Sequence, residues 1–298
     1  MSYIPFTLLA YFLNGIAVLV DKFLLTSKIT NPLIYVFYLS LASLLILALL
    51  PFTVFPSLIV FILASISTII WTSGLVFMYL ALKEGLVTRV IPVNGTLIPI
   101  FLLVFAIYSK SVTNTEIAAI LVLILGLILL TIFEWRGKIT LRETIYIVLS
   151  AFLFAVSYLF LREAYLRTNF LTVLVWSRIV LVPLGILIVV IPKSRKMVLG
   201  SGGKSFSLFS KQGLLFLFGQ AAGGSSELLI TFSVSLATPA LVNSLQGSQY
   251  LFLFIASLFL GRKFPEIFKE QHTHLKTAFK ILGIICIALG LYILAFYK

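Results

Sequence analysis

The sequence predicts an all-α integral membrane protein with ten transmembrane helices in two inverted five-helix repeats. Its 298 residues are 61% hydrophobic and only 10% charged, whereas soluble domains are about 45–50% apolar and about 25% charged. The apolar residues fall into ten segments, each near the length of about 17–25 residues that crosses the hydrocarbon core as a helix. Blocks of the first half also match blocks of the second half, which indicates an internal repeat.

The expected spans are joined by short links, which favour antiparallel neighbouring helices. They are residues 4–20, 31–50, 57–81, 86–108, 115–133, 141–161, 170–191, 213–237, 239–260 and 277–296. No basic region precedes the first apolar stretch, so we expect a first span there rather than a cleavable signal peptide. Pro92, Pro99 and Pro183 lie inside spans, where a kink is expected.

Two ungapped shifts relate the halves of the chain. A shift of 141 positions lays residues 10–25 on residues 151–166, and a shift of 152 lays residues 90–110 on residues 242–262. Each half has five spans, an odd number, so the halves must have opposite orientations in the membrane. Such inverted repeats are typical of transporters that bind substrate near the midplane, where the repeats meet. The expected repeats are residues 1–135 and 140–298.

These matching blocks resemble a known family. The first half carries Tyr79-Leu-Ala-Leu-Lys-Glu-Gly-Leu-Val and Gly126-Leu-Ile-Leu-Leu, and the second carries Ser235-Leu-Ala-Thr-Pro-Ala and Gly290-Leu-Tyr-Ile-Leu. Over nearly its whole length the chain resembles the drug/metabolite transporter superfamily, in its EamA-type branch. The resemblance implies a secondary carrier, often an exporter of small metabolites or drugs, that works by alternating access.

The chain departs from this family at two span ends. Many members end the fourth and ninth spans with a Gly-Glu pair, where this chain has Ser109-Lys110 and Gly261-Arg262. Because of this departure, the resemblance does not identify the substrate.

The stretch at residues 219–250 is unusually polar for its expected depth. It contains Gln220, Ser225, Ser226, Glu227, Asn243, Ser244, Gln246, Ser248 and Gln249. Hydrocarbon penalises such groups unless they face protein or water. Asn243, Gln246 and Tyr250 are spaced i, i+3, i+7, which places them on one face of a helix. We therefore expect this stretch to line a solute pathway.

Arg178 and Glu227 are ionisable residues near the middle of expected spans. Intramembrane ions usually face a cavity or one another, so one interpretation is a structural ion pair or a headgroup-facing arginine. The other is functional: Arg178 attracts an anionic substrate group, and Glu227 binds an amine or a proton. On this second interpretation we expect Arg178, Glu227, Asn94 and Gln246 to face one central cavity, with Glu227 coupling transport to protons.

Further candidates for substrate contact are polar or aromatic side chains in other spans. They are Asn14, Trp71, Tyr79, Asn94, Tyr158 and Trp176. The alternative for the rings is ordinary packing or an interfacial belt. The repeat matches Asn94 with Gln246, and for these amides the alternative is hydrogen bonding between helices.

Several other classes of site are disfavoured. Residues 200–205 resemble a phosphate-binding loop, but Val198 stands where the first glycine is required. His272 and His274 point to different helix faces and lack a third metal ligand nearby. Cys286 is the only cysteine, so no internal disulfide or cysteine metal site is expected, and no cofactor is indicated.

The basic residues predict the topology. The net charge of +13 resides mostly in short loops, which indicates contact with anionic lipid headgroups rather than with nucleic acid. Seventeen Lys or Arg lie on one side of the ten-span map and four on the other. The positive-inside rule therefore makes the loop at residues 193–211 and the loop holding His272 cytoplasmic, with both termini outside. Ten-span members of the resembled family usually keep both termini inside.

The predicted function is transport of a small-molecule solute across the plasma membrane. A translocator of lipid-linked sugars or lipids is the alternative within transport. An intramembrane enzyme would need a nucleophile–base or metal constellation, which Glu227 and isolated serines do not supply. The sequence leaves the coupling ion, the direction of transport and the oligomeric state open.

Overall fold

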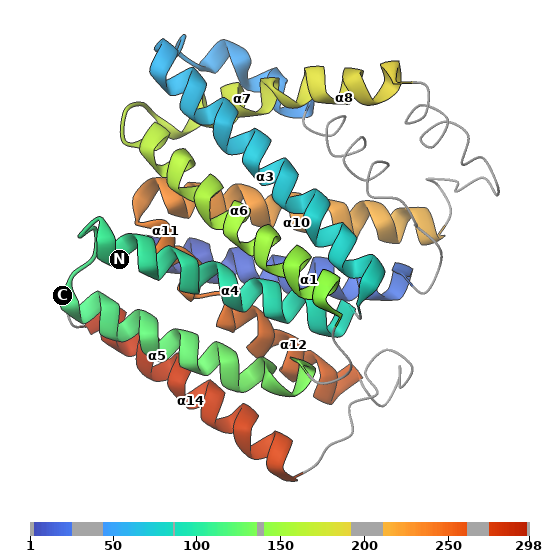
Figure 1. The fold of residues 1–298 in the computed structure, drawn as a ribbon, viewed down its shortest axis with the longest axis vertical. Coiled ribbons are helices and arrows are strands. Elements are labelled where there is room, and N and C mark those ends of the chain that lie inside the picture. The colour runs from blue at the N-terminus through green and yellow to red at the C-terminus, as the bar shows by residue number, and fades with distance from the viewer. Residues whose placement is uncertain are drawn as a thin grey trace. The chain divides into compact units, whose positions relative to one another are not determined.

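The protein is described by a computed structural model that covers residues 3–25, 44–85, 87–135, 140–191, 211–260 and 274–296. Every regular element in these ranges is a helix (Figure 1). Six of the described helices are long and apolar enough to cross a membrane, which fits a multi-pass membrane-embedded protein. Their apolar segments are Tyr3–Val20, Leu58–Leu82, Arg89–Tyr108, Asn114–Thr131, Leu141–Tyr165 and Leu275–Phe296.

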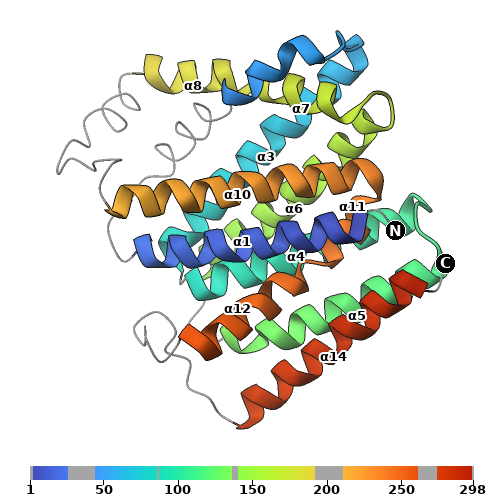
Figure 2. The same ribbon diagram turned by 180° about the vertical axis from the view of Figure 1, so that it is seen from behind.

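The chain forms two compact units that interleave along the sequence. Unit 1 comprises Met1–Ile29, Ile91–Lys138 and Phe206–Lys298. Its helices are α1 (Tyr3–Leu25), most of α4 (Val87–Tyr108), α5 (Asn114–Thr131), the 3-10 helix η2 (Ile132–Trp135), α10 (Lys211–Leu236), α11 (Pro239–Ser244), α12 (Gly247–Leu260) and α14 (His274–Phe296). Within this unit α1 packs along α10, and α5 packs along α14 (Figure 2).

Unit 2 comprises Thr30–Val90 and Ile139–Ser205. Its described helices are the 3-10 helix η1 (Leu44–Phe52), α3 (Leu58–Glu84), the first residues of α4, α6 (Leu141–Tyr165), α7 (Phe170–Ile179) and α8 (Leu181–Val190). Helices α3 and α6 lie side by side along their lengths, and α7 crosses α3 (Figure 1).

Two expected spans are interrupted. The seventh is divided at Val180 into α7 and α8. Pro183 explains this break, because it has no N–H for the carbonyl of Ile179 and its ring clashes with that carbonyl. The expectation of one uninterrupted ninth helix is wrong, since α11 ends at Ser244 and α12 begins at Gly247. By contrast, α4 continues through Pro92 and Pro99.

Parts of the sequence-based map lie outside the described residues. They include residues 26–43 of the first link and expected second span, most of the basic loop at residues 193–211, and His272. The described end of the second span forms part of η1.

The outer faces of the helices are apolar. Leu282, Ile285 and Leu289 on α14 are 52%, 49% and 52% exposed, and Leu121 and Leu125 on α5 are similarly open. Water would penalise such a continuous apolar surface, whereas lipid tails do not. These faces are therefore suited to hydrocarbon.

Glycines set the close approach of α5 and α14. A Cβ added to Gly283 would lie 2.9 Å from the carbonyl oxygen of Gly126, and a Cβ added to Gly126 would lie 2.9 Å from that of Gly283. Small residues allow such backbone contact between membrane helices, where packing rather than hydrophobic exclusion drives association.

Gly283→Ala is expected to destabilise the protein by about 1–3 kcal/mol, because backbone rather than a flexible side chain opposes the new methyl group. The matched control is Gly224→Ala on α10, where an added Cβ meets nothing within 4 Å. That control should be neutral or stabilising, since alanine favours helix over glycine by about 0.5–1 kcal/mol. Thermal unfolding of both purified variants measures the difference, and equal melting temperatures would refute the glycine contact.

Candidate functional site

The break between α11 and α12 is built from short backbone hydrogen bonds. The Leu245 N–H donates to the Val242 carbonyl at 3.3 Å, and the Gln246 N–H donates to the Asn243 carbonyl at 3.1 Å. Two further bonds of the same i to i−3 type follow, from Ser248 and Gln249. This tight turn replaces the regular α-helical ladder and separates the two helices.

Polar side chains at the break also bond to nearby backbone. The Asn243 Nδ2 donates to the Pro239 carbonyl at 3.0 Å, and the Ser248 Oγ donates to the Leu245 carbonyl at 2.7 Å. Such bonds offer carbonyls an alternative to the helix ladder. Gly247 begins α12 where α14 is close, since an added Cβ would lie 2.8 Å from the Ile287 Cδ1.

Helix α1 meets the break through two polar contacts within unit 1. The Asn14 Nδ2 donates to the Gln249 Oε1 at 3.0 Å, and the Tyr11 hydroxyl donates to the Asn243 Oδ1 at 3.4 Å. Gln249 is 1% exposed and Asn243 is 3% exposed. A buried amide without a partner is costly, so these contacts hold α1 against the break.

Helix α4 meets the other side of the break. The Tyr250 hydroxyl donates to the Ile91 carbonyl at 3.1 Å. A Cβ on Gly95 would lie 2.5 Å from the Gln246 Nε2 and 2.8 Å from the Tyr250 hydroxyl. Gly95 therefore lets both side chains reach the backbone of α4, and its neighbour Asn94 is buried.

Glu227 belongs to the same unit. It is half-buried on α10, within electrostatic range of the Tyr11 hydroxyl. The Oγ of the adjacent Ser226 is buried and has no hydrogen-bond partner among the described residues. Unit 1 thus gathers a carboxylate, several amides and two tyrosines around a broken helix. We call the set Tyr11, Asn14, Asn94, Glu227, Asn243, Gln246, Gln249 and Tyr250 the amide cluster.

The sequence interpretation did not single out two members of this cluster as substrate contacts. Tyr11 was not named, and Gln249 was named only as part of the polar stretch at residues 219–250, although each lies three residues from an expected contact, Asn14 and Gln246 respectively. That spacing was the available signal, since residues three apart share a helix face.

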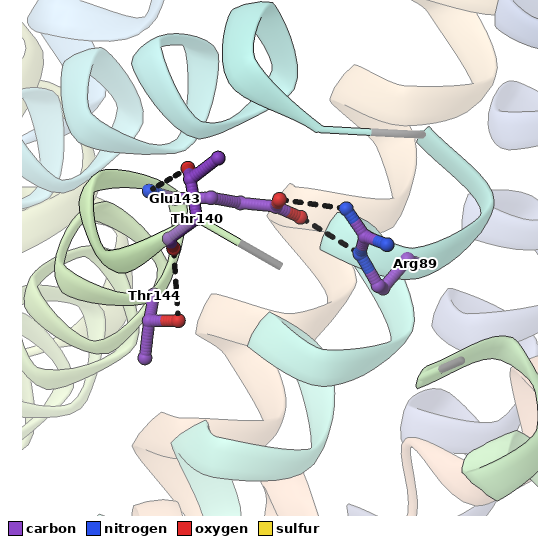
Figure 3. Close-up of polar contacts among 4 residues, drawn as sticks. All are labelled: Arg89, Thr140, Glu143 and Thr144. Atoms are coloured by element: carbon purple, nitrogen blue, oxygen red, sulfur yellow. Dashed lines mark hydrogen bonds and ion pairs between the residues drawn. The ribbon is translucent and has the colours of Figure 1, made fainter. Parts of the chain in front are cut away.

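Unit 2 contains a buried ion pair that the sequence did not reveal. The Arg89 Nε donates to the Glu143 Oε1 at 2.8 Å, and its Nη2 donates to the Glu143 Oε2 at 2.6 Å (Figure 3). Their side chains are 5% and 0% exposed. Such a two-point contact uses the planar geometry of both groups.

Local structure positions Glu143 for this contact. The Thr140 Oγ1 caps α6 by accepting the Glu143 N–H at 3.1 Å, which starts the helix at this point (Figure 3). Gly85, at the end of α3, leaves room for the carboxylate, because an added Cβ would overlap it. The ion pair therefore joins the first turn of α4 to the first turn of α6.

Four of the expected aromatic residues, Trp71, Tyr79, Tyr158 and Trp176, lie in unit 2, where the two tryptophans make ring contacts. Trp176 packs edge-on against Phe55 and Phe61, with centroid distances of 4.9 and 6.0 Å, and Trp71 packs against Phe154 at 5.8 Å. These contacts agree with the packing alternative. Tyr158 is buried on α6 and Tyr79 is half-buried on α3, and a role in substrate contact stays a prediction for all four expected residues.

Arg178 also belongs to unit 2, in the last turn of α7. Its Nε is buried and has no hydrogen-bond partner among the described residues. Glu227 belongs to unit 1, so the predicted Arg178–Glu227 pair and their shared cavity stay predictions. Metal binding has no support within the described ranges, where no group of three potential ligands occurs.

Comparison with known proteins establishes the fold but no family. No family model matches the sequence, and no curated protein matches it significantly. The fold is similar to a solved structure described as "Crystal structure of protein", with a TM-score of 0.65 over 98% of this chain and 96% of that one. The two sequences are 13% identical, so the likeness shows a common fold alone.

Proposed function

We propose that this protein is a secondary transporter of the EamA type, which exports a small metabolite or drug-like solute by alternating access. The observation that carries the proposal is the broken helix at Leu245 and Gln246, surrounded by the amide cluster. Irregular backbone at membrane depth is tolerated only where it is buried in protein or lines a cavity. Transporters commonly bind their substrates at such discontinuous helices.

The helix pairs support an inverted repeat. In unit 1, α1 from the first half packs along α10 from the second half. In unit 2, α6 from the second half packs along α3 from the first half. The sequence match relates α1 to α6, and α3 and α10 correspond to the third expected span of each half. The two pairs are therefore those expected when two repeats are related by a two-fold axis.

The amide cluster suggests how a solute is held. Amide and hydroxyl groups can each donate or accept, so a polar solute can replace the bond between Asn14 and Gln249 without leaving either group unpaired. Exchange of this kind would loosen α1 from α12 on binding. Glu227 is the carboxyl group of the cluster, which makes it the candidate for exchanging protons and coupling transport to a pH gradient.

Thermal-shift screening of the purified protein tests the proposal. Amino acids, nucleosides, sugars and lipid-linked precursors are the probes, since a ligand that binds the folded state raises the melting temperature. We expect a water-soluble solute to stabilise the protein, and Gln246→Ala to weaken its binding about tenfold through a lost hydrogen bond. Ser73→Ala is the control, because the Ser73 hydroxyl bonds only to the Ile69 carbonyl of its own helix.

The outcomes separate the alternatives. Stabilisation by lipid-linked precursors alone would favour the translocator over the solute carrier. If no probe stabilises the protein, or if Gln246→Ala and Ser73→Ala behave alike, the assignment of the amide cluster as the solute site is wrong.

A further inference from the structure

Arg178 lies near the middle of the seventh expected span and has no ion-pair partner among the described residues. The segments that make up unit 2 contain three acidic residues: Glu84, Glu143 and Glu163. Intramembrane arginines usually pair with an acid or face a cavity. Within unit 2, these three carboxylates are the groups that could pair with Arg178.

None of the three carboxylates is available to Arg178. Glu143 is bound to Arg89 at 2.6 Å, and Glu163 is bound to Arg167 at 2.6 Å. Glu84 is the exposed last residue of α3. Helix α7 contacts α3 sixteen residues earlier, at Thr68, which is about 24 Å away along the helix at 1.5 Å per residue.

Other donors without partners flank the same helix crossing. The Thr68 Oγ1 donates to the Ser177 carbonyl at 3.0 Å; Trp176 and Arg178 are the neighbours of Ser177 in the chain, and their side chains lie on different faces of α7. The Trp176 Nε1 and the Ser65 Oγ are both buried and lack partners among the described residues. Ser65 lies one helical turn before Thr68, on the face of α3 that meets α7.

In the described part of the chain, the three unpartnered groups, on Ser65, Trp176 and Arg178, are all hydrogen-bond donors. Arginine and tryptophan side chains donate hydrogen bonds and accept none, and a serine hydroxyl can also donate. A buried donor without an acceptor costs free energy, so the Arg178 guanidinium, whose Nε is one such donor, is suited to an incoming acceptor. A guanidinium group preferentially binds paired oxygens of carboxylates and phosphates.

We propose that Arg178 binds an oxyanion, a carboxylate or a phosphate, carried by the transported solute. The inference rests on the proposed transport function and narrows its substrate class to solutes with an anionic group. Arg178 lies in the last turn of α7, two residues before the break at Val180.

Fluorescence quenching tests anion binding independently of transport. Trp71→Phe and Trp135→Phe leave Trp176, two residues from Arg178, as the only tryptophan. Iodide is the anionic probe and acrylamide is the neutral one, both applied to the full chain in phosphatidylcholine vesicles. We expect the ratio of iodide to acrylamide quenching constants to fall several-fold in Arg178→Gln and to persist in Arg178→Lys, which keeps the charge.

Competition then identifies the source of the oxyanion. Inorganic phosphate or benzoate should suppress iodide quenching in neutral vesicles, whereas benzamide, the uncharged counterpart of benzoate, should not. Suppression by phosphatidylglycerol vesicles alone would assign Arg178 to lipid headgroups and overturn the proposal. An unchanged quenching ratio in a folded Arg178→Gln protein would also overturn it.

The transport proposal can fail separately. If anions bind at Arg178 but the anionic solutes that suppress quenching are not transported, the anion site is supported and the proposed carrier function is wrong. If a neutral solute is transported and Arg178→Gln leaves its transport rate unchanged, the carrier function is supported and the assignment of an anionic substrate class is wrong.

Discussion

Glu143→Gln is expected to lower the free energy of unfolding by about 3–5 kcal/mol, the typical cost of breaking a buried ion pair from one side. The cost arises because the Arg89 guanidinium, whose side chain is 5% exposed, stays buried without its counter-charge. Thermal unfolding of the purified protein, followed by circular dichroism at constant detergent concentration, measures the loss.

The same helix offers a matched control. Glu163, also on α6, pairs with Arg167 just after the end of that helix, but these two side chains are 46% and 45% exposed. Exposed pairs contribute about 0–1 kcal/mol, since water solvates either partner alone. Glu163→Gln should therefore leave the melting temperature nearly unchanged, and an equal effect of both substitutions would contradict the buried-pair argument.

A double substitution separates charge burial from packing. Arg89→Met combined with Glu143→Leu removes both charges and keeps apolar volume, so much of the stability lost in Glu143→Gln should return. If the double variant is less stable than either single variant, the pair contributes net stability rather than only avoiding an unpaired charge.

Glu227→Gln is expected to abolish pH-driven accumulation of solute while preserving solute binding. Glutamine keeps the shape and hydrogen-bonding capacity of the side chain but cannot exchange a proton. A charge at the centre of a membrane helix costs about 2.5–3.5 kcal/mol on insertion scales, which favours a functional reason for the carboxylate. Accumulation in proteoliposomes with an imposed pH gradient, and thermal shift by the solute, measure the two properties separately.

The control for this prediction is Glu116→Gln in the same unit. Glu116 completes the capping box of α5 by accepting the Thr113 N–H at 2.8 Å, and glutamine serves equally in that motif. Accumulation driven by a pH gradient should be the same in Glu116→Gln as in the unaltered protein. Normal accumulation by a folded Glu227→Gln protein would exclude proton coupling at Glu227.

The structural alternative for Glu227 gives a different result. If Glu227 is only the partner of Arg178, Glu227→Gln should destabilise the protein, and adding Arg178→Gln should restore much of the loss. Independent effects of the two substitutions would instead indicate that the residues act apart.

Local sequence was sufficient for the membrane class and for the approximate bounds of the long described helices. A kink was expected at Pro92, Pro99 and Pro183; the helix is interrupted near Pro183 but continues through the other two. Hydrocarbon selects long apolar runs whatever their neighbours, so composition and run length predict spans directly. Pro183 likewise acts on its own helix, through a missing N–H and a steric clash within four residues. The break at Leu245 was not predicted, because the amides around it also fit the face of a continuous helix.

Two copies of one motif show what only the tertiary structure decided. Thr113 and Glu116 form a complete capping box on α5, in which the Glu116 carboxylate accepts a hydrogen bond from the Thr113 N–H of the same helix end. Thr140 and Glu143 have the same spacing and Thr140 caps α6, yet the Glu143 side chain binds Arg89, 54 residues away in the chain. The bond between Asn14 and Gln249 joins residues 235 positions apart. Sequence spacing determines which groups share a helix face, but only helix packing determines which distant group each one meets.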